Sequence, residues 1–427
     1  MKLADQPELS CGTGSSVVVT RCQICGSEML ESMLFLGYLP PVNQMRSLDE
    51  KPHEEAAYPA EMLHCKKCEL VQLGLIVDPN ILFPPEYPYT SGTTRILREN
   101  FAEMEREVAK LYPLGKDDLV VDIGSNDGTL LSNFKNAGHR VAGIEPTLMA
   151  NLANERGIPT QMAFFDRTSA EKALAEHGKA KLITATNVFA HIENIHEIVE
   201  SLLLLLDEKG LFISESHYLY SLMETLQYDT IYHEHLRYYS VTSLKYLLEA
   251  HGLEIIYAKK IPTHGGSVRV VAARRGAYPV SQAAKDILAE EARQPLNTER
   301  VEAFKRSVVS SKLKLYALLN ELKEAGTRVY GIGAPSRAST LIHYVGLDDG
   351  LLDCVLEVKG SYKTGKFMPG TRIPVLEESR LFDDPPDYAL LLSWHIAEEL
   401  MPKLRQKGYR GGFIIPLPEP RIIRADA

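Results

Sequence analysis

The stretch LVVDIGSNDGTLL at residues 119–131 decides the fold class. A hydrophobic strand-like run ends at Ile123, and a glycine-containing turn leads from it into a helix-like segment. Further strand-like runs follow at 140–147, 180–192 and 210–219, with helix-like segments between them. Strands that alternate with helices are typical of a parallel, doubly wound sheet. We therefore predict an α/β fold.

A second α/β series occupies the C-terminal part of the chain. It begins with TRVYGIGAPSRASTL at 327–341 and ends with RGGFIIPL at 410–417, which predicts a second, smaller parallel sheet. Between the two series, residues 281–325 have the apolar spacing of one long connecting helix. Residues 253–261 and 265–275 have the pattern of a hairpin that closes the first sheet.

Length and composition limit the class of protein. The 427 residues correspond to about three domains at roughly 150 residues each. Hydrophobic residues at 45% and charged residues at 24% are typical of globular proteins. The net charge of -9 argues against nucleic acid as the main ligand. We expect a cytoplasmic protein, because the chain has neither a secretory signal nor an apolar run long enough to cross a membrane.

Cysteines are concentrated near the N-terminus and form two C-x2-C pairs. These are Cys22 with Cys25 and Cys65 with Cys68. Four thiolates complete the tetrahedral shell of a structural zinc ion and leave no position open for substrate. The alternatives are a redox-active C-x-x-C or unrelated buried cysteines. We predict one structural zinc ion, held in a small module rich in short strands.

The first glycine loop has the pattern D-x-G-x-x-x-G, counted from Asp122. It lacks the third glycine of the dinucleotide-binding G-x-G-x-x-G pattern, and it resembles the first motif of class I S-adenosylmethionine methyltransferases. That resemblance implies that the loop contacts the methionine part and that the glutamate of GIEP accepts hydrogen bonds from the ribose. The alternatives are a structural turn and, for the histidine of TNVFAHI, a structural role. The implied cofactor-binding residues are Asp122, Gly124, Asn126, Gly128, Glu145, Pro146, Asn187, Val188 and His191.

Eight of the 20 tyrosines lie between residues 218 and 257, around the stretch IYHEHLRYYS. Its centre offers hydroxyl, imidazole and carboxylate groups, which are the groups used for proton transfer near neutral pH. A polar surface loop or a metal-binding H-x-H are the alternatives. We predict that this stretch carries the reaction chemistry.

Taken in order, the cysteine pairs, the first glycine loop, IYHEHLRYYS and GIGAPSRASTL resemble the three-domain sugar C-methyltransferases, which methylate C3 of nucleotide-linked 4-keto-deoxysugars. The resemblance covers nearly the whole chain after Thr20. It implies a zinc-binding module at 17–82, an S-adenosylmethionine-dependent methyltransferase domain at 83–278 and a Rossmann-like nucleotide-sugar-binding domain at 279–427. The implied pathway is branched deoxysugar biosynthesis.

The same resemblance implies roles for individual residues. His235 would remove the C3 proton, with Glu234 and Tyr232 beside it. Removal of that proton leaves an enolate, because the C4 ketone accepts the charge, and hydrogen-bond donors must then stabilise the enolate oxygen. The family also has a tyrosine from the segment after the zinc module at its active site. The candidate donors are Tyr87, Tyr89 and His233.

The second glycine loop, GIGAPSRAS, has Ser336 where the dinucleotide pattern requires a third glycine, so we do not predict an NAD site. Ser336 and Arg337 near a helix start, with Lys359 and Lys363 downstream, form a candidate site for a diphosphate. In the family the nucleotide end of the substrate lies between the middle and C-terminal domains. The alternative is a sheet that only completes the cleft.

Other functions remain open from the sequence. An O- or N-methyltransferase would need a base but no enolate, and a binding protein could sense S-adenosylmethionine without catalysis. The sequence does not distinguish thymidine from guanosine nucleotides, and it does not predict the oligomeric state.

Overall fold

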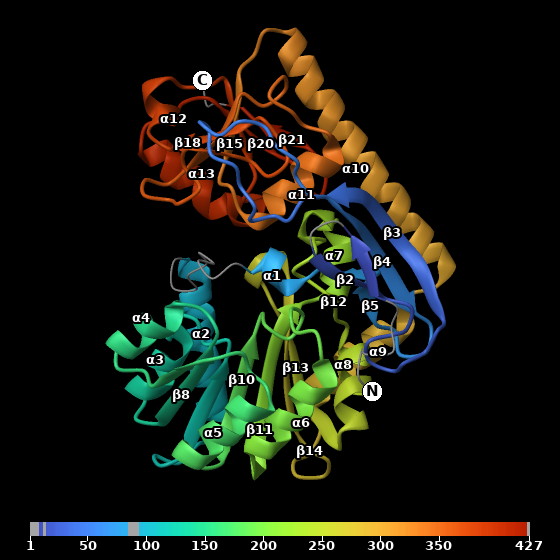
Figure 1. Ribbon diagram of the computed structural model, residues 1–427, viewed down its shortest axis with the longest axis vertical. Coiled ribbons are helices and arrows are strands. Elements are labelled where there is room, and N and C mark those ends of the chain that lie inside the picture. The colour runs from blue at the N-terminus through green and yellow to red at the C-terminus, as the bar shows by residue number, and fades with distance from the viewer. Residues whose placement is uncertain (1–7, 12–13, 84–93, 425–427) are drawn as a thin grey trace.

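The computed structural model describes residues 8–11, 14–83 and 94–424. Figure 1 shows a doubly wound domain at the bottom, a second sheet domain at the top and a flank of N-terminal strands on the right. Within the described residues, no helix combines the length and the apolar character that a bilayer crossing requires.

The N-terminal part is built from short antiparallel strands. One sheet has the order β12-β5-β4-β3, and its edge strand β12 comes from the IYHEHLRYYS segment. A smaller sheet has the order β1-β2-β6, and α1 follows it. The elements are β1 (Glu8–Cys11), β2 (Gly14–Val18), β3 (Leu30–Leu39), β4 (Tyr58–Cys65), β5 (Val71–Leu73), β6 (Leu75–Ile76), α1 (Pro79–Leu82) and β12 (Arg237–Tyr238).

The connection between β3 and β4 reaches the C-terminal domain. Ser47 forms an antiparallel bridge with Lys366, and the Phe367 N–H donates to the Arg46 carbonyl at 2.8 Å. The guanidinium of Arg46 also lies over the Phe367 ring. The insertion that separates the two cysteine pairs therefore ties the first part of the chain to the last.

The middle sheet has the order β13-β14-β11-β10-β7-β8-β9, with the glycine-loop strand β7 in its interior. All strand pairs are parallel except those of β14, which runs antiparallel to β11 and β13. The predicted closing hairpin is confirmed. The strands are β7 (Leu119–Ile123), β8 (Arg140–Glu145), β9 (Thr160–Met162), β10 (Ala180–Thr186), β11 (Leu206–His217), β13 (Leu253–Ile261) and β14 (Ser267–Arg274).

Apolar side chains cover both faces of this sheet. Every residue of β7 is buried, as expected for a strand covered on both sides. Helix α5 begins where the Asp166 carboxylate accepts the Ser169 N–H, a capping box. The helical segments of this domain are α2 (Arg95–Leu111), α3 (Thr129–Asn136), α4 (Met149–Glu155), α5 (Arg167–His177), α6 (Ile195–Leu205), α7 (Leu219–Glu224), η3 (Tyr228–Thr230), α8 (Val241–Ala250) and η4 (Thr263–Gly265).

The C-terminal sheet has the order β17-β18-β16-β15-β19-β20-β21. We predicted a smaller sheet, but it has seven strands like the first and differs in having shorter ones. Its edge pairs are antiparallel and its inner pairs are parallel. The elements are β15 (Val329–Ile332), α11 (Ser336–Val345), β16 (Cys354–Glu357), β17 (Lys366–Phe367), β18 (Pro374–Glu377), α12 (Arg380–Asp383), β19 (Tyr388–Leu391), η5 (Trp394–Ile396), α13 (Ala397–Gln406), β20 (Gly412–Ile415) and β21 (Arg421–Ile423).

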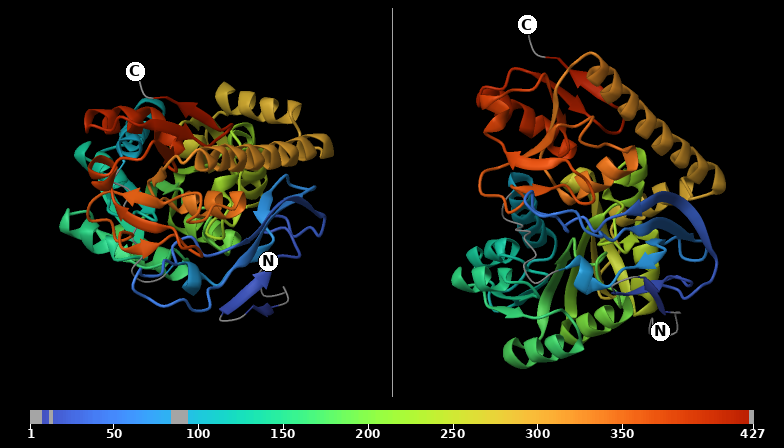
Figure 2. Two further views of the ribbon diagram at one scale, coloured as in Figure 1. Left: turned by 90° about the horizontal axis from the view of Figure 1, so that it is seen from above. Right: turned by 45° about the horizontal axis from the view of Figure 1, so that its top comes forward.

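The single long helix predicted over 281–325 is wrong. The structure has two helices, α9 (Gln282–Arg293) and α10 (Thr298–Glu324). Pro295 lies in the break, because it has no N–H to continue a helix, and the Asn297 side chain caps α10 by accepting the Arg300 N–H at 2.9 Å. Helix α10 then runs along one side of the molecule from the region of β3 to the C-terminal sheet (Figures 1 and 2).

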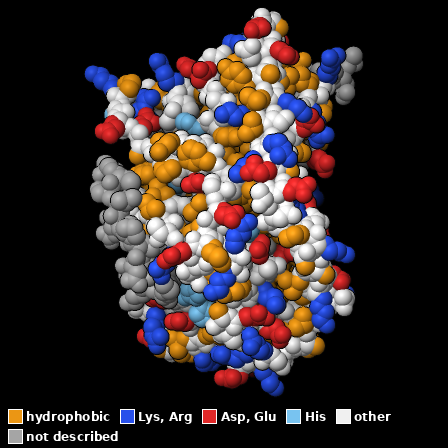
Figure 3. Space-filling model, turned by 90° about the vertical axis from the view of Figure 1, so that its right-hand side faces the viewer, with side chains coloured by type: hydrophobic (Ala, Val, Ile, Leu, Met, Phe, Trp, Pro, Cys, Tyr) orange, Lys and Arg blue, Asp and Glu red, His pale blue; other side chains and the backbone are white. Residues whose placement is uncertain are grey.

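The face that carries α10 and β3 exposes several large apolar side chains (Figure 3). Those on the helix recur at helical spacing, and those on the strand include an edge-to-face aromatic pair. They are Phe35, Tyr38, Val309, Leu313 and Tyr316.

Candidate active site and metal site

The four cysteines of the two C-x2-C pairs come together as predicted. Their sulfur atoms all lie within 4.8 Å of one another, with Cys22 Sγ 3.4 Å from Cys68 Sγ and Cys25 Sγ 3.4 Å from Cys65 Sγ. Zinc–sulfur bonds of about 2.3 Å place the sulfurs of a tetrahedral site roughly 3.8 Å apart. The donor set and its spacing therefore fit a structural zinc ion.

Backbone turns hold each cysteine pair, and one pair is fixed to the middle domain. The Gly26 N–H donates to the Cys22 carbonyl at 2.9 Å, and the Glu69 N–H donates to the Cys65 carbonyl at 3.0 Å. Nε2 of His196 on α6 donates to the Ile24 carbonyl at 2.8 Å. The metal site thus fixes the N-terminal strands against the doubly wound sheet.

The loop after β7 has a backbone that only glycine allows at its first position. Gly124 has φ +68°, and a Cβ there would lie 2.4 Å from Cγ2 of Val188. Its N–H donates to the Ile144 carbonyl at 2.8 Å. Gly128 also has positive φ, at +75°, where α3 begins. Val188 therefore lies against the loop.

Glu145 ends β8 and supports this loop from the next strand. Its carboxylate accepts the Asn126 N–H at 3.0 Å and the Thr147 N–H at 2.9 Å, and Pro146 lies between them at a half-buried bend. A carboxylate has about four lone-pair positions. The carboxylate also accepts the Thr147 hydroxyl at 2.6 Å, so three of these positions are used and acceptor capacity for a ribose hydroxyl remains on Oε2.

Asn187 and His191 follow β10, beside the same loop. Asn187 has φ +55°, and its side-chain oxygen is buried without a hydrogen-bond partner. Nδ1 of His191 donates to the Glu234 carbonyl at 2.6 Å, since a carbonyl can only accept. Three features fit an adenosyl ligand such as S-adenosylmethionine: the glycine loop, the Glu145 carboxylate and the unpaired buried amide oxygen of Asn187.

Asp122 differs from the other predicted cofactor residues. It is 2% exposed, and it accepts a hydrogen bond from Thr184 Oγ1 at 2.6 Å within the sheet. Burial raises the pKa of this carboxyl to about 7. Asp122 is thus tied into the sheet through Thr184, and its contact with a ligand stays a prediction.

His235 lies at the centre of an aromatic and imidazole cluster. Its ring centroid is 4.2 Å from Tyr232, 4.9 Å from His191 and 5.1 Å from His217. Its Nδ1 donates to the Thr230 carbonyl at 2.8 Å, so Nε2 carries the free lone pair in the neutral ring.

Burial sets the charge of these groups. It lowers the pKa of His235 well below the ordinary value, so the ring is neutral near pH 7 and can accept a proton. Burial also raises the pKa of Tyr232 well above its ordinary value, so its hydroxyl keeps its proton. The cluster combines a neutral base with a hydroxyl donor.

His233 was predicted as a donor to the enolate oxygen, and the structure corrects this. Its Nε2 donates to the Pro59 carbonyl at 3.2 Å, and its ring packs edge-on against Tyr58 on β4. Glu234 also contacts the N-terminal part, because its carboxylate accepts Asn43 Nδ2 at 2.8 Å. These two side chains dock the YHEH segment onto the strands. The other two candidate donors, Tyr87 and Tyr89, lie outside the described residues.

Arg337 was predicted to hold a diphosphate, and the structure shows a different use. Its guanidinium makes two bonds of 2.8 Å to Asp229 and one of 3.2 Å to Gln227, and it is 6% exposed. The Asp229 carboxylate also accepts the indole N–H of Trp394 at 2.7 Å. Arg337 therefore connects the two domains through its Nε and Nη2 groups.

The remaining residues of that prediction are not gathered in one cluster. Lys363 Nζ donates to the Ala334 carbonyl of the second glycine loop at 2.5 Å. Ser336 is the half-buried first residue of α11, and Lys359 is exposed. Of the four residues, Ser336, Arg337 and Lys363 lie at the loop, and Arg337 is bound to Asp229.

Glu357, which ends β16 beside the second glycine loop, was not predicted from the sequence. Its carboxylate accepts the Ala334 N–H at 2.7 Å and the Val358 N–H at 3.1 Å. An acid about 20 residues after a glycine loop, at the end of the next strand, was the available signal. His217, at the end of β11, and His264, in the turn between β13 and β14, were not predicted either, because they share no local motif.

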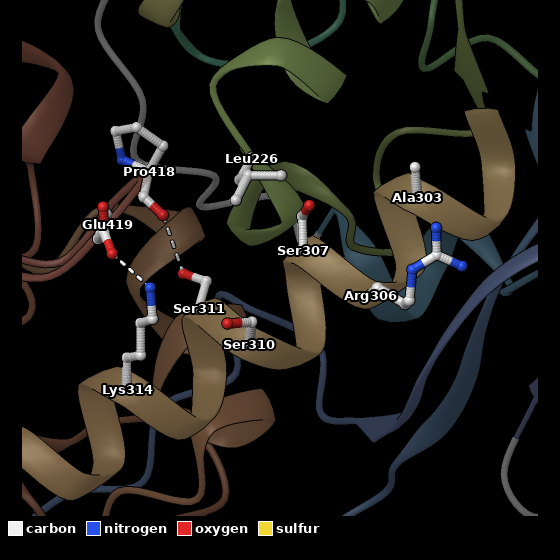
Figure 4. A pocket seen from close by; sticks show the side chains of 9 residues that line it. All are labelled: Leu226, Ala303, Arg306, Ser307, Ser310, Ser311, Lys314, Pro418 and Glu419. Atoms are coloured by element: carbon white, nitrogen blue, oxygen red, sulfur yellow. Dashed lines mark hydrogen bonds and ion pairs between the residues drawn. The ribbon is translucent and has the colours of Figure 1, made fainter. Parts of the chain in front are cut away.

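A pocket of about 550 Å³ lies elsewhere, along α10 (Figure 4). Some of its polar side chains already have partners within the protein. Ser311 Oγ donates to the Pro418 carbonyl at 3.1 Å, and Lys314 pairs with Glu419. None of the predicted site residues lines it. The lining residues are Leu226, Ala303, Arg306, Ser307, Ser310, Ser311, Lys314, Pro418 and Glu419.

Three family models match successive parts of the chain. A zinc binding domain matches residues 22–83, a methyltransferase domain matches 96–258, and a C-methyltransferase C-terminal domain matches 262–418.

Among individual proteins, C-methyltransferase NovU of Streptomyces niveus is 33% identical over 413 residues, which cover 96% of this chain and 98% of the relative. Two solved structures are more distant. Magnesium protoporphyrin IX methyltransferase from Synechocystis, with bound SAM, has 16% identity and a TM-score of 0.32 over 42% of this chain and 79% of that one. An S-adenosylmethionine-dependent methyltransferase from Clostridium acetobutylicum has 14% identity and a TM-score of 0.34 over 42% and 92%.

The relative extends over nearly the whole of both chains, and the family models match all three structural parts in order. The chain therefore belongs to the three-domain, S-adenosylmethionine-dependent C-methyltransferases with an N-terminal zinc-binding domain.

Proposed function

We propose that this enzyme methylates C3 of a nucleotide-linked 4-keto-deoxysugar. The observation that carries the proposal is the bond from His235 Nδ1 to the Thr230 carbonyl. It fixes the tautomer in which Nε2 is the proton acceptor, in a buried ring that stays neutral near pH 7. Methylation of a carbon requires such a base, because the carbon must lose a proton before it can attack.

His235 and Tyr232 have different roles in the proposed proton transfer. S-adenosylmethionine, when bound, supplies an electrophilic methyl group. His235 takes the C3 proton at Nε2, and the electron pair left behind moves onto the C4 oxygen as an enolate. Tyr232 keeps its proton because burial raises its pKa. A protonated hydroxyl is suited to stabilise charge on that oxygen, and Tyr87 or Tyr89 remains a candidate for the same role.

The cofactor would lie on the loop after β7. We assign Gly124 and Gly128 to the close backbone approach and Glu145 to the ribose hydroxyls. Asn187 would use its unpaired side-chain oxygen toward the adenosyl group. The order of the elements supports this assignment, since ligands of doubly wound sheets bind at the carboxyl ends of the strands.

The nucleotide end of the substrate would lie on the second glycine loop. Glu357 repeats the position of Glu145 at the end of the next strand, and we assign it to the nucleotide ribose. Lys363 bonds to the Ala334 carbonyl of this loop and would face the diphosphate. Arg337 is left out of this role because Asp229 already binds its guanidinium.

Hydrogen exchange at C3 tests the proposal. A nucleotide-linked 4-keto-deoxysugar with deuterium at C3 should lose its label to water when incubated with the enzyme alone. With the methyl donor, carbon NMR should show the new methyl group on carbon. A methyl group on oxygen or nitrogen, without loss of deuterium, would contradict the proposal.

Replacing His235, the proposed base, tests its role directly. His235→Asn should lower both exchange and methyl transfer by about 10²–10⁴-fold, the usual contribution of general base catalysis. It should still bind S-adenosylmethionine in calorimetry. His139→Asn, a change near the surface and outside the cluster, serves as the control.

A further inference from the structure

Two histidines that the proposed reaction does not use extend the cluster beyond His235. His217 ends β11, and its ring centroid is 5.1 Å from that of His235. His264 lies in the turn between β13 and β14, with its ring centroid 5.4 Å from that of His217. The described residues show no direct hydrogen bond between these rings, so a proton passing from one ring to the next would use one bridging water.

The turn that carries His264 is held in an unusual conformation. His264 has φ +55° and ψ +22°, the left-handed region that most side chains disfavour. The Gly265 carbonyl accepts Gln227 Nε2 at 2.7 Å, and Gln227 Oε1 in turn accepts a bond from Arg337. A Cβ at Gly265 would lie 2.7 Å from Gln227 Oε1. Contacts with Gln227 therefore hold this strained backbone in place, and the turn directs the His264 imidazole toward the cluster.

The ring of His264 has an enclosed edge and a more open one. Its Nε2 is buried without a hydrogen-bond partner, while the residue as a whole is only half-buried. The groups that face His217 and His264 are His191, His235, His395 and the guanidinium of Arg337. Burial lowers the pKa of His264 to about 4 and that of His217 well below its ordinary value. Both rings are thus neutral at rest, with one nitrogen able to accept a proton and the other able to donate one.

The proposed reaction leaves His235 with an additional proton in a buried site. That proton must leave before the next substrate can react, and a charged ring surrounded by neutral ones is disfavoured by burial. Nδ1 of His235 is already bound to the Thr230 carbonyl. The proton must therefore leave from the Nε2 side.

We propose that His217 and His264 form a proton relay that returns His235 to its neutral form after each turnover. The proton on His235 Nε2 passes to His217, a proton from the opposite nitrogen of His217 passes to His264, and His264 releases a proton to water or buffer at its open edge. One positive charge moves outward, and no electrons are gained or lost. The relay rests on the proposed function, since it needs His235 as the base.

His264→Asn separates the relay from the methyl transfer itself. Asparagine tolerates the left-handed backbone better than most residues but cannot carry a proton onward. In rapid-quench experiments with S-adenosylmethionine, the first turnover should stay within about twofold of the wild type, because His235 is intact. Later turnovers should slow at least about tenfold, giving a burst of one product per site.

His264→Gly keeps the turn and leaves space for a soluble base. Imidazole added to this variant should restore the later turnovers and leave the first one unchanged. His139→Asn, which changes a histidine outside the cluster, should show neither a burst nor rescue.

Each outcome distinguishes the relay from the proposed function. If the wild type does not exchange C3 deuterium or methylate the sugar, the proposed function fails. If the wild type is active and both variants keep normal later turnovers, only the relay is overturned. A first turnover that falls as much as the later ones, without imidazole rescue, would also overturn it, because His264 would then act only by holding the site in place.

Discussion

The loop after β7 and the loop after β15 follow the same backbone plan. In each, a glycine N–H donates at 2.8 Å to the carbonyl of the residue before a strand-ending glutamate. The glycines are Gly124 and Gly333, and the glutamates Glu145 and Glu357 each accept two backbone N–H groups. The repeated plan follows from the strand-turn-helix-strand order of both domains.

The side chains around the two loops differ. Each loop has one basic side chain bonded to a backbone carbonyl, Lys363 to Ala334 in the second and Arg156 to Asp127 in the first. Arg156 also pairs with the Asp127 carboxylate at 2.9 Å, whereas Lys363 forms no ion pair among the described residues. Helix α11, after the second loop, directs Arg337 into the interdomain contact. Under the proposed function, the first loop would hold the adenosyl group of S-adenosylmethionine and the second loop the nucleotide of the substrate. A diphosphate is suited to the loop with the lysine.

The largest expected effect comes from adding a methyl group to each glycine. Gly124→Ala would place Cβ 2.4 Å from the branched Val188 side chain, whereas Gly333→Ala would meet Ser393 Oγ at 2.6 Å, and that hydroxyl can rotate away. We expect Gly124→Ala to weaken S-adenosylmethionine binding at least about 100-fold, or roughly 2.7 kcal/mol. Gly333→Ala should leave that affinity unchanged and weaken nucleotide diphosphate binding about tenfold.

Calorimetry with each ligand measures both effects. Gly138→Ala is the control, because Gly138 has φ +95° with nothing within 4 Å, so it tests backbone strain alone. That strain is worth about 1–2 kcal/mol of stability. Equal losses of both ligands in both loop variants would show that the loops do not act separately.

A smaller effect is expected from the two glutamates. Glu145→Gln and Glu357→Gln keep the side-chain shape but remove the charge that strengthens bonds to hydroxyls. Hydrogen bonds to charged groups contribute about 1.5–3 kcal/mol, so each variant should lose about tenfold to 100-fold in affinity for its own ligand. Glu145→Gln should affect S-adenosylmethionine and Glu357→Gln the nucleotide. Loss of the same ligand in both variants would contradict the assignment of the two loops.

Local patterns made part of this architecture predictable from the sequence. The alternation of strand-like and helix-like segments around residues 119–131 predicted the doubly wound sheet. The spacing of the cysteine pairs predicted the metal ligands, because a C-x2-C turn brings its own two thiolates together. The break of the connecting helix could also be read locally, since Pro295 lacks the N–H that a continuous helix needs.

Contacts between distant segments could not be predicted in the same way. Arg337 and Asp229 are 108 residues apart, and nothing near Arg337 signals that a buried carboxylate will bind it. His233 is bound by Pro59, 174 residues away. For such residues the sequence shows the chemical group, but tertiary packing decides whether the group faces a ligand or another domain.

The smallest expected effect concerns a buried carboxyl that only the first loop has. Asp122 lies two residues before Gly124, and the corresponding position before Gly333 is Gly331. Burial raises the pKa of Asp122 to about 7, above its ordinary value near 4. The unfolded chain therefore ionises first, and stability falls as the pH rises from about 4 to about 7.

Asp122→Asn removes this titration while its side-chain oxygen can still accept the Thr184 hydroxyl. Relative to the wild type, the variant should gain stability between pH 5 and pH 8, by roughly 2 kcal/mol in the free energy of unfolding. Thermal and urea unfolding at the two pH values measure the gain. Asp117→Asn, an exposed change before the same strand, should show no such gain. A constant difference between Asp122→Asn and wild type at both pH values would mean that Asp122 is already ionised in the folded protein. In that case a carboxylate charge would belong to the first loop. The second loop has no such charge, because Gly331 occupies the corresponding position.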